Sequence, residues 1–219
     1  MPKATGRLII VGGGGFGHEI ATWAADCHRA GTLPPVAGYL DDDEDRGPLG
    51  PGVARIGALT DFQPQAGDEL LLGVGAPATK RKLVELLRPR GARFATLIHP
   101  TAIIGSNCRH DEGVIICPLA MNTANTAMGS FSTLLSFSGL GHDSRLGAFS
   151  TVSSHVDIMG HAVVGEGVFI GSGARVMPSV TVGDDARIGA NVVAQRNVAA
   201  GLTLFAAPAK SLKMPLARD

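Results

Sequence analysis

Hydrophobic positions follow two different periods in the two halves of the chain. Up to about Ile98, short apolar runs alternate with stretches whose apolar residues recur at helical spacing. That order is typical of a parallel sheet whose strands are joined by helices. The pattern predicts strands at 8–11, 36–40, 70–72 and 94–98, a helix at about 18–30, and a second helix carrying Leu83, Leu86 and Leu87.

After His99-Pro100 the period becomes six. Thirteen of the 17 positions reached by steps of six from Ile104 to Ala200 are Ile, Leu, Val or Met, and Gly follows nine of the 17. A repeat of this length predicts a parallel β-helix with the aliphatic residue pointing inward and the small residue at a corner. A β-sandwich is disfavoured, because its strands recur every 8 to 12 residues.

The predicted fold is therefore a Rossmann-like βαβ α/β domain at residues 1–98, followed by an all-β parallel β-helix at 99–219. The 219 residues carry 19 basic and 19 acidic side chains, which excludes a generally basic nucleic-acid-binding surface. The three cysteines lack CxxC spacing, and no segment is long and apolar enough for a membrane span. We therefore expect a cytoplasmic protein that neither binds nucleic acid nor inserts into membranes.

A glycine-rich turn follows the first predicted strand. Gly12, Gly14 and Gly17 form GxGxxG at the start of a helix, where backbone N–H groups can approach a phosphate. A nicotinamide dehydrogenase would also fit this motif, but about four strands are too few for a full dinucleotide fold. A single nucleotide fits better, and a turn that binds nothing is the structural alternative.

His142-Asp143 is the main candidate for catalysis. An imidazole can accept a proton near neutral pH, and an adjacent carboxylate can orient it. The alternative is an exposed histidine at a β-helix corner. His155 and His161 could join His142 in a metal site, but hydrogen-bonded histidines are commoner, and no metal is predicted.

The hexapeptide array, the His99-Pro100-Thr101-Ala102 entry and the closing Ala207-Pro208-Ala209-Lys210 resemble the left-handed β-helix acyltransferases. With the glycine-rich first half, the chain is similar to sugar acetyltransferases such as the bacillosamine-pathway and perosamine N-acetyltransferases and the sialic acid O-acetyltransferase-like proteins. The resemblance implies a homotrimer. It also implies acetyl-CoA bound between neighbouring β-helices and a nucleotide sugar bound by the first domain.

The same resemblance assigns roles to individual residues. His142 becomes the general base and Asp143 its support, and a backbone N–H near Gly160 becomes the oxyanion donor. Thr151 stands where relatives often carry a histidine near the acetyl group, and its hydroxyl is expected to donate a hydrogen bond to acetyl-CoA there. Ser172 and Ala190 match positions that line the acetyl-CoA groove in relatives, and Lys210 is expected to contact a CoA phosphate. The structural alternatives are small residues that permit a β-helix corner and a terminal lysine that is only solvated. The nucleotide-sugar residues implied are Gly14, Gly15, Phe16, Asp41, Asp42 and Gly75.

The implied reaction is direct N-acetylation of a nucleotide-linked amino sugar, with a 4-amino-4,6-dideoxy sugar as the usual acceptor of the family. Two other functions remain open at this stage. One is O-acetylation of a sialic acid or related sugar, because a His-Asp pair serves a hydroxyl equally well. The other is a non-catalytic trimer that binds a nucleotide sugar.

Overall fold

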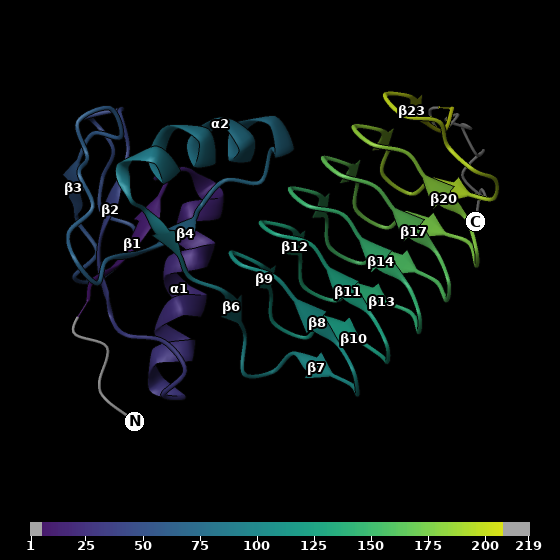
Figure 1. The fold of residues 1–219 in the computed structure, drawn as a ribbon, viewed down its shortest axis with the longest axis horizontal. Coiled ribbons are helices and arrows are strands. Elements are labelled where there is room, and N and C mark those ends of the chain that lie inside the picture. The colour runs from purple at the N-terminus through teal and green to yellow at the C-terminus, as the bar shows by residue number, and fades with distance from the viewer. Residues whose placement is uncertain (1–5, 208–219) are drawn as a thin grey trace, which may run out of the picture.

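The computed structural model describes residues 6–207 and contains two parts, a helix-flanked parallel sheet and a solenoid of stacked coils (Figure 1). The sheet has the order β3-β2-β1-β4-β5, and all its strands are parallel. The predicted strands at 8–11, 36–40 and 70–72 are confirmed, whereas the short edge strand β3 lacks an apolar run and was not predicted. The strands are β1 (Leu8–Val11), β2 (Val36–Leu40), β3 (Arg55–Gly57), β4 (Glu69–Leu72) and β5 (Arg93–Phe94).

The two helices cover opposite faces of this sheet. Successive β1 residues point to opposite sides, so Leu8 and Ile10 pack with α1 (Gly15–Arg29), while Ile9 and Val11 pack with α2 (Pro77–Leu87). A 3-10 turn, η1 (Arg88–Arg90), follows α2. No helix within residues 6–207 combines the length and the apolar character needed to cross a bilayer.

The single strand predicted at 94–98 is wrong, because the chain divides there into two strands with different partners. β5 ends at Phe94 and pairs with β4 at the edge of the sheet. β6 (Leu97–Ile98) pairs with β9 (Ile115–Ile116) and begins the solenoid. Periodicity alone did not reveal this division, since both halves of the segment are apolar.

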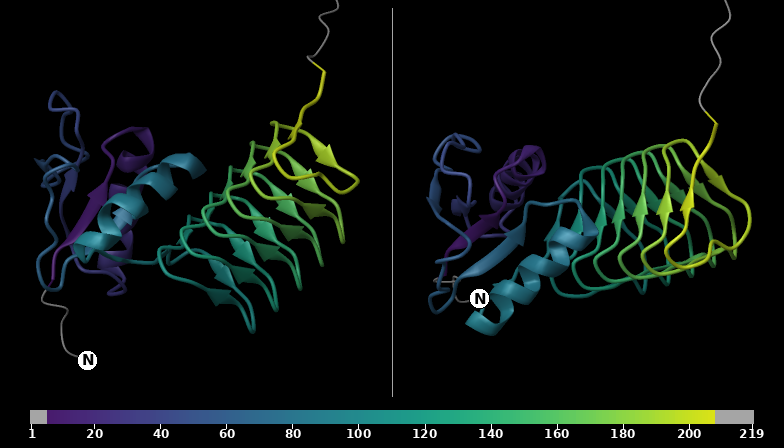
Figure 2. Two further views of the ribbon diagram at one scale, coloured as in Figure 1. Left: turned by 45° about the horizontal axis from the view of Figure 1, so that its top comes forward. Right: turned by 90° about the horizontal axis from the view of Figure 1, so that it is seen from above.

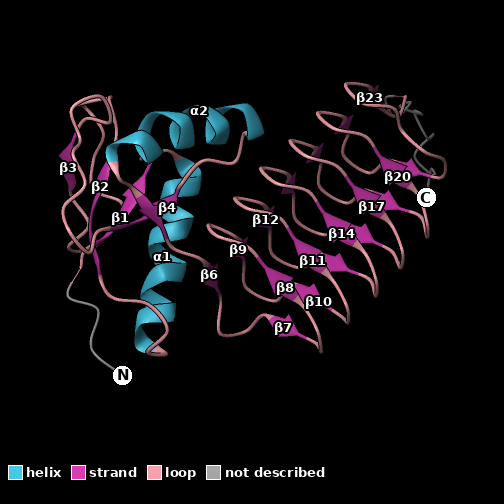
Figure 3. Cartoon of the chain, in the orientation of Figure 1, coloured by secondary structure: helices cyan, strands magenta, loops and turns pink. Residues whose placement is uncertain are grey.

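The predicted parallel β-helix is confirmed as a three-sided solenoid of two-residue strands, drawn in magenta in Figure 3. We call its seven-, six- and five-stranded sheets face 1, face 2 and face 3. Face 1 contains β6, β9, β12 (Thr133–Leu134), β15 (Thr151–Val152), β18 (Phe169–Ile170), β21 (Arg187–Ile188) and β23 (Thr203–Leu204). Face 2 contains β7 (Ile103–Ile104), β10 (Met121–Asn122), β13 (Gly139–Leu140), β16 (Asp157–Ile158), β19 (Arg175–Val176) and β22 (Val193–Ala194). Face 3 contains β8 (Arg109–His110), β11 (Ala127–Met128), β14 (Arg145–Leu146), β17 (Val163–Val164) and β20 (Thr181–Val182).

The coils of the solenoid stack on one another (Figure 2). The stacking places residues 18 positions apart side by side, as in the pairing of Leu134 with Val152. The second residue of most strands is buried and forms one continuous aliphatic core. Two polar residues of the six-residue series also pair near the first coil, where the Asn122 amide lies 2.9 Å from Nε2 of His110. Core burial therefore follows the period seen in the sequence.

The corners explain the small residues of the repeat. A Cβ at Gly129 would lie 2.7 Å from the backbone nitrogen of Ala148 in the next coil, so this position has no room for a side chain. From Ile104 to Ile188, the third residue after each inward position lies in the left-handed region of backbone conformation, as at Asn125 and Asp143, with φ of 56° and 60°.

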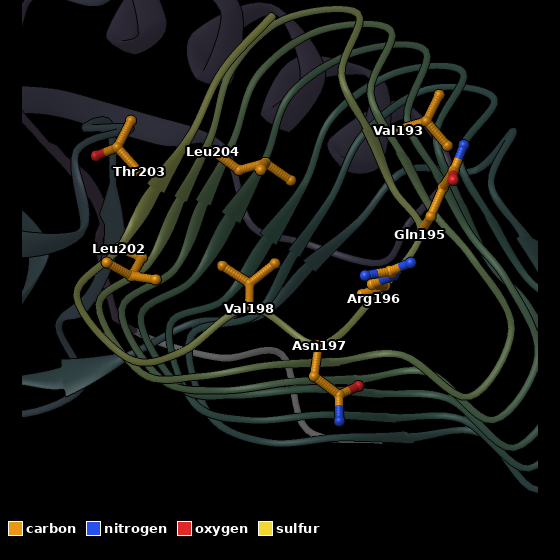
Figure 4. Close-up of a pocket in the computed structure, with 8 residues that line it drawn as sticks. All are labelled: Val193, Gln195, Arg196, Asn197, Val198, Leu202, Thr203 and Leu204. Carbon is orange, nitrogen blue, oxygen red and sulfur yellow. The ribbon is translucent and has the colours of Figure 1, made fainter.

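The last coil departs from the period. Val182 pairs with Val198 rather than with Ala200, and Arg187 pairs with Thr203, so this coil is two residues shorter than the others. Val198 is buried and Ala200 is exposed. A hollow of about 370 Å³ lies at this end of the solenoid, with Val198 and Leu204 among the residues that line it (Figure 4).

Candidate functional site

His142 and Asp143 lie on the edge between faces 2 and 3, in the corner that joins β13 to β14. Nδ1 of His142 donates a hydrogen bond to Oδ2 of Asp143 at 2.9 Å, and the imidazole is 61% exposed. The hydrogen bond leaves Nε2 directed away from the carboxylate. An exposed, oriented imidazole of this kind can accept a proton from a bound nucleophile.

Gly160, one coil further on, makes room for this imidazole. A Cβ at Gly160 would lie 2.6 Å from Nε2 of His142, so the ring occupies space that any other residue would fill. The backbone N–H of His161 donates to the carbonyl of His142 at 2.9 Å and ties the two coils together. No hydrogen bond made within residues 6–207 uses the Gly160 N–H, which leaves it available as a donor.

A column of polar corner residues supports Asp143 from the preceding coils. Nδ2 of Asn125 donates to Oδ1 of Asp143 at 3.1 Å, and Asn107 donates in turn to Asn125 at 3.1 Å. The hydrogen bond from His142 holds the pKa of Asp143 below its ordinary value, and the Asn125 amide acts in the same direction. The carboxylate is therefore ionised and fixed at both oxygens.

His142, Asp143 and His161 bring three possible metal ligands within 4.8 Å of one another. Nδ1 of His142 and Oδ2 of Asp143 already engage each other, so within this group the imidazole retains Nε2 as its free ring nitrogen. His155 is not part of this group. It lies at the corner between faces 1 and 2, stacked on Phe137 with ring centroids 4.9 Å apart.

The glycine-rich turn contains glycines of two kinds. Gly12 has a φ of +103°, and a Cβ at Gly13 or Gly17 would approach Tyr39 or the Gly12 carbonyl to 2.5 and 2.2 Å. These three are required by the fold. Gly14 and Gly15 face open space, with no atom within 4 Å of a Cβ built there. This division matches the roles of tight turn, close helix packing and ligand approach in dinucleotide-binding turns.

The acidic residues after β2 engage the protein itself. Oδ2 of Asp41 accepts a hydrogen bond from the Gly13 N–H at 2.6 Å, which fixes the glycine-rich turn. Burial would raise the pKa of Asp41, but hydrogen bonds from the Asp43 and Gly13 amides and the charge of Arg46 hold it below its ordinary value. Asp42 accepts a hydrogen bond from the Leu59 N–H at 2.8 Å. Phe16 packs edge-on against Trp23, with ring centroids 6.0 Å apart.

Gly75 lies in the loop between β4 and α2, beside face 1. It lines a hollow of about 430 Å³ together with Phe169 and Arg187 of the solenoid. Its carbonyl accepts a hydrogen bond from Oγ1 of Thr151 at 2.7 Å. The loop is therefore tied directly to the solenoid.

The assignment of Thr151 to the acetyl-CoA groove is wrong for this chain. Thr151 is only 1% exposed, and its hydroxyl is engaged by Gly75 and by Nζ of Lys80 at 2.8 Å. A side chain enclosed between α2 and face 1 cannot line a surface groove.

Ser172 and Ala190 are exposed and stack on each other at the edge between faces 1 and 2, where the Asn191 N–H donates to the Ser172 carbonyl. His142 and Gly160 lie on the opposite edge of face 2. The structure therefore does not bring these two pairs together within one chain. Lys210 lies outside the described residues.

The glycine-rich turn and His142 lie on opposite sides of the solenoid. The first half of the chain packs on face 1, where Nζ of Lys80 donates to Oγ1 of Thr133 at 2.7 Å and Arg81 pairs with Asp185 at the edge between faces 3 and 1. In a three-sided solenoid the edge between faces 2 and 3 lies opposite face 1. One chain therefore does not place the turn next to His142.

Two residues of this arrangement were missed in the sequence. Asn125 precedes Asp143 by one coil of 18 residues, a spacing that becomes meaningful once the three-sided repeat is known. Lys80 is fully buried, and burial lowers its pKa to about 7. Its spacing of three, four and seven residues from Leu83, Val84 and Leu87 places it on the apolar face of α2, unlike Lys82, and this was the signal that could have revealed it.

Comparison with protein families identifies residues 161–194 as a bacterial transferase hexapeptide repeat (six repeats). No curated protein matches the sequence. Among solved structures, the acetyltransferase domain of PglB from Neisseria gonorrhoeae FA1090, in complex with acetyl coenzyme A, is 26% identical. The match covers 94% of this chain and 98% of that one, with a TM-score of 0.64. WeeI from Acinetobacter baumannii AYE has the same fold, with 24% identity, 95% and 100% coverage and a TM-score of 0.83.

A histidine-to-asparagine variant of perosamine N-acetyltransferase from Caulobacter crescentus, in complex with CoA and GDP-perosamine, is 30% identical. The match covers 94% of this chain and 97% of that one, with a TM-score of 0.84. Likeness of this degree extends over both parts of the fold. The chain belongs to the hexapeptide-repeat family of sugar N-acetyltransferases.

Proposed function

We propose that this protein transfers the acetyl group of acetyl-CoA to the amino group of a nucleotide-linked amino sugar, with His142 as general base. The observation that carries the proposal is the exposed imidazole of His142, oriented by Asp143 at 2.9 Å and seated over Gly160. The relative with 30% identity was solved with CoA and GDP-perosamine, a nucleotide-linked amino sugar.

In the proposed reaction the acceptor nitrogen attacks the thioester carbonyl carbon while Nε2 of His142 takes a proton from that nitrogen. Asp143 accepts the hydrogen bond from Nδ1 and stabilises the imidazolium that forms. The Gly160 N–H is the proposed donor to the carbonyl oxygen as negative charge develops there. The C–S bond then breaks, and CoA leaves as the thiol.

A covalent acetyl-cysteine route is disfavoured. Cys27 and Cys117 are buried, and burial raises the pKa of both thiols, which opposes formation of the reactive thiolate. Cys108 is partly accessible but lies on an earlier coil than His142, whose Nε2 faces Gly160 on the following coil, so the proposed base does not adjoin this thiol. Direct transfer within a ternary complex requires no such nucleophile.

We assign nucleotide-sugar binding to a Rossmann-like domain at residues 1–98. Gly14, Gly15 and Gly75 support this assignment, because all three face open space at the carboxyl ends of β1 and β4. Asp41 shapes the site by fixing the Gly13 amide, whereas Phe16 and Asp42 border it. The proposed acceptor class is a 4-amino-4,6-dideoxy sugar linked to a nucleoside diphosphate.

A cytoplasmic homotrimer of left-handed β-helices at residues 99–219 is part of the same proposal. In one chain His142 lies opposite the part that would bind the sugar, so a second chain must bring the acceptor to it. Ser172 and Ala190 are the proposed acetyl-CoA contacts on the other edge of face 2, and Lys210 is a further proposed contact.

A thiol-release assay with acetyl-CoA tests the function, with a panel of UDP-, GDP- and dTDP-linked 4-amino sugars and a sialic acid as acceptors. We expect one class of acceptor to react, and His142→Ala to lower kcat by roughly 10² to 10⁴. His28→Ala is the control, because that exposed histidine lies at the C-terminal end of α1, away from His142 and from the proposed acetyl-CoA contacts. Equal rates for wild type and His142→Ala would refute the assignment of the base, and reaction with sialic acid hydroxyls alone would refute N-acetylation.

A further inference from the structure

A polar hollow of about 420 Å³ lies on face 3, beside the edge that carries His142. Arg109 of β8 and Arg145 of β14 line it on either side of Ala127. Ala127 pairs with both arginines in the strand register. Because neighbouring strands lie about 4.8 Å apart, the two arginine backbones are about 10 Å apart, and the short alanine side chain leaves the space between them open.

The charge of this hollow is unbalanced. Its lining contains the two arginines and no acidic side chain. Neither arginine belongs to an ion pair within residues 6–207. Guanidinium groups present planar pairs of donors that match the oxygens of a phosphoryl group, so two of them flanking one cavity favour a phosphorylated ligand.

The hollow is also close to the catalytic pair. Asn125 lines it, and the same side chain donates to Oδ1 of Asp143 at 3.1 Å. A ligand held by the arginines therefore lies one side chain away from the carboxylate that orients His142. This placement links the charged hollow to a substrate of the reaction.

We propose that the hollow between Arg109 and Arg145 is a subsite for the phosphoryl groups of a substrate. The proposal rests on the acetyltransferase function proposed above. Both substrates of that reaction carry phosphoryl groups: the acceptor has a nucleoside diphosphate, and CoA has a diphosphate and a 3′-phosphate. The chemistry at the arginines is the same for either source.

Cys108 provides a reporter within the site. It lines the hollow and is the one partly accessible cysteine of the chain's three, since Cys27 and Cys117 are buried. Its rate of alkylation by the uncharged reagent iodoacetamide, followed by peptide mass spectrometry, reports whether the hollow is occupied. The full-length wild-type protein is labelled alone and with GDP, UDP, dTDP, CoA, 3′-dephospho-CoA or inorganic phosphate.

We expect saturating GDP, UDP or dTDP to slow labelling about tenfold if the acceptor occupies the hollow, and CoA to do so if the donor does. Weaker protection by 3′-dephospho-CoA would identify the 3′-phosphate as the bound group. Arg109→Gln and Arg145→Gln should each lower the affinity of the protecting ligand about tenfold, as expected for loss of one charge-assisted contact. Arg109→Lys should restore part of that loss, and Arg29→Gln at the C-terminal end of α1 should leave protection unchanged.

Labelling that no probe slows, or protection that persists in the double Arg109→Gln, Arg145→Gln variant, would overturn the subsite. A double variant that loses protection together with its wild-type oligomeric state would also overturn it, since the arginines would then join subunits. The thiol-release assay on the same preparation separates the two proposals. Acetyl transfer without protection of Cys108 would refute only the subsite. Arginine-dependent protection of Cys108 without acetyl transfer to any acceptor would refute only the proposed activity.

Discussion

At the scale of single residues, the position of His142 depends on the side chains that neighbouring coils supply and on the space that they leave empty. His142 has a carboxylate beside it in sequence, but the position of its ring is set by Gly160 in the next coil. Asn125 in the preceding coil fixes the other carboxylate oxygen. The reacting atom is therefore positioned by three successive coils.

Gly160→Ala should impair catalysis while leaving the fold intact. The new Cβ would lie 2.6 Å from Nε2 of His142 and would push an exposed ring, which can move, away from its position. A displacement of about 1 Å at a reacting group costs on the order of 10² in rate, so we expect kcat to fall by that factor with little change in Tm.

Gly139→Ala on the preceding coil is the matched control for this variant, because its Cβ would meet only ordinary contacts at 3.8 and 3.9 Å. Steady-state kinetics and thermal unfolding of both variants provide the measurement. Wild-type kcat in Gly160→Ala would contradict the position assigned to the reacting imidazole.

At the scale of secondary-structure elements, the solenoid is stabilised by coil-to-coil contacts that tolerate no extra atoms. The glycine after each inward residue lies where the next coil passes, and at Gly147 the neighbouring atoms belong to the backbone of Gly165. Backbone atoms in a ladder cannot move aside as an exposed imidazole can. Glycines at equivalent repeat positions therefore serve different purposes.

Gly147→Ala should destabilise the solenoid without touching the catalytic pair. Its Cβ would lie 2.4 Å from the carbonyl carbon and oxygen of Gly165. Overpacking of this kind costs roughly 1–3 kcal/mol, and the rigid neighbour favours the upper end of that range. Urea unfolding should show the loss, while kcat of the remaining folded enzyme stays near the wild-type value. Wild-type stability would show that adjacent coils separate more easily than the packing implies.

At the scale of the whole molecule, one buried lysine joins the two parts. Nζ of Lys80 donates to the hydroxyls of Thr133 and Thr151, and it contacts the Phe131 carbonyl at 3.0 Å. All its partners are neutral oxygens, so its charge is not balanced by a carboxylate. Burial accordingly lowers the pKa of Lys80 to about 7.

Because of Lys80, the free energy of unfolding should rise as the pH is raised above 7. Between pH 7 and the ordinary lysine value of 10.5, the unfolded chain holds a proton that the folded chain lacks, so raising the pH favours the folded state. Burial raises the pKa of Cys117 and so gives the opposite slope above about pH 9. From pH 7 to 8.5 we expect the free energy of unfolding to rise by on the order of 1 kcal/mol per pH unit.

Urea titrations of wild type and Lys80→Met over this range measure the slope, which the substitution should remove. Lys82→Met, on the exposed side of the same helix, should keep it. An equal slope in wild type and Lys80→Met would contradict the assignment to Lys80.

The opposed positions of the glycine-rich turn and His142 predict complementation between chains. Gly14→Leu should block the proposed nucleotide site without strain, because nothing lies within 4 Å of a Cβ there. His142→Ala and Gly14→Leu should each be nearly inactive. Co-expressed with different tags and purified through both, they should regain activity, because one chain retains a binding site and another an intact base.

The control for complementation is an assembly in which every chain carries both His142→Ala and Gly14→Leu. This assembly should stay inactive. If doubly purified mixed assemblies show no more activity than either parent, the two sites do not come from different chains.

The sequence by itself determined the repeat, the inward positions, most of the first sheet and the His142-Asp143 pair, because each follows from the spacing of neighbouring residues. The division of 94–98 into β5 and β6, the shortened last coil at Val198 and the burial of Thr151 depended on how the parts pack. Lys80 and Asn125 acquire their roles from residues 53 and 18 positions away. Local periodicity reports which way a side chain points, whereas only the tertiary structure decides what lies opposite it.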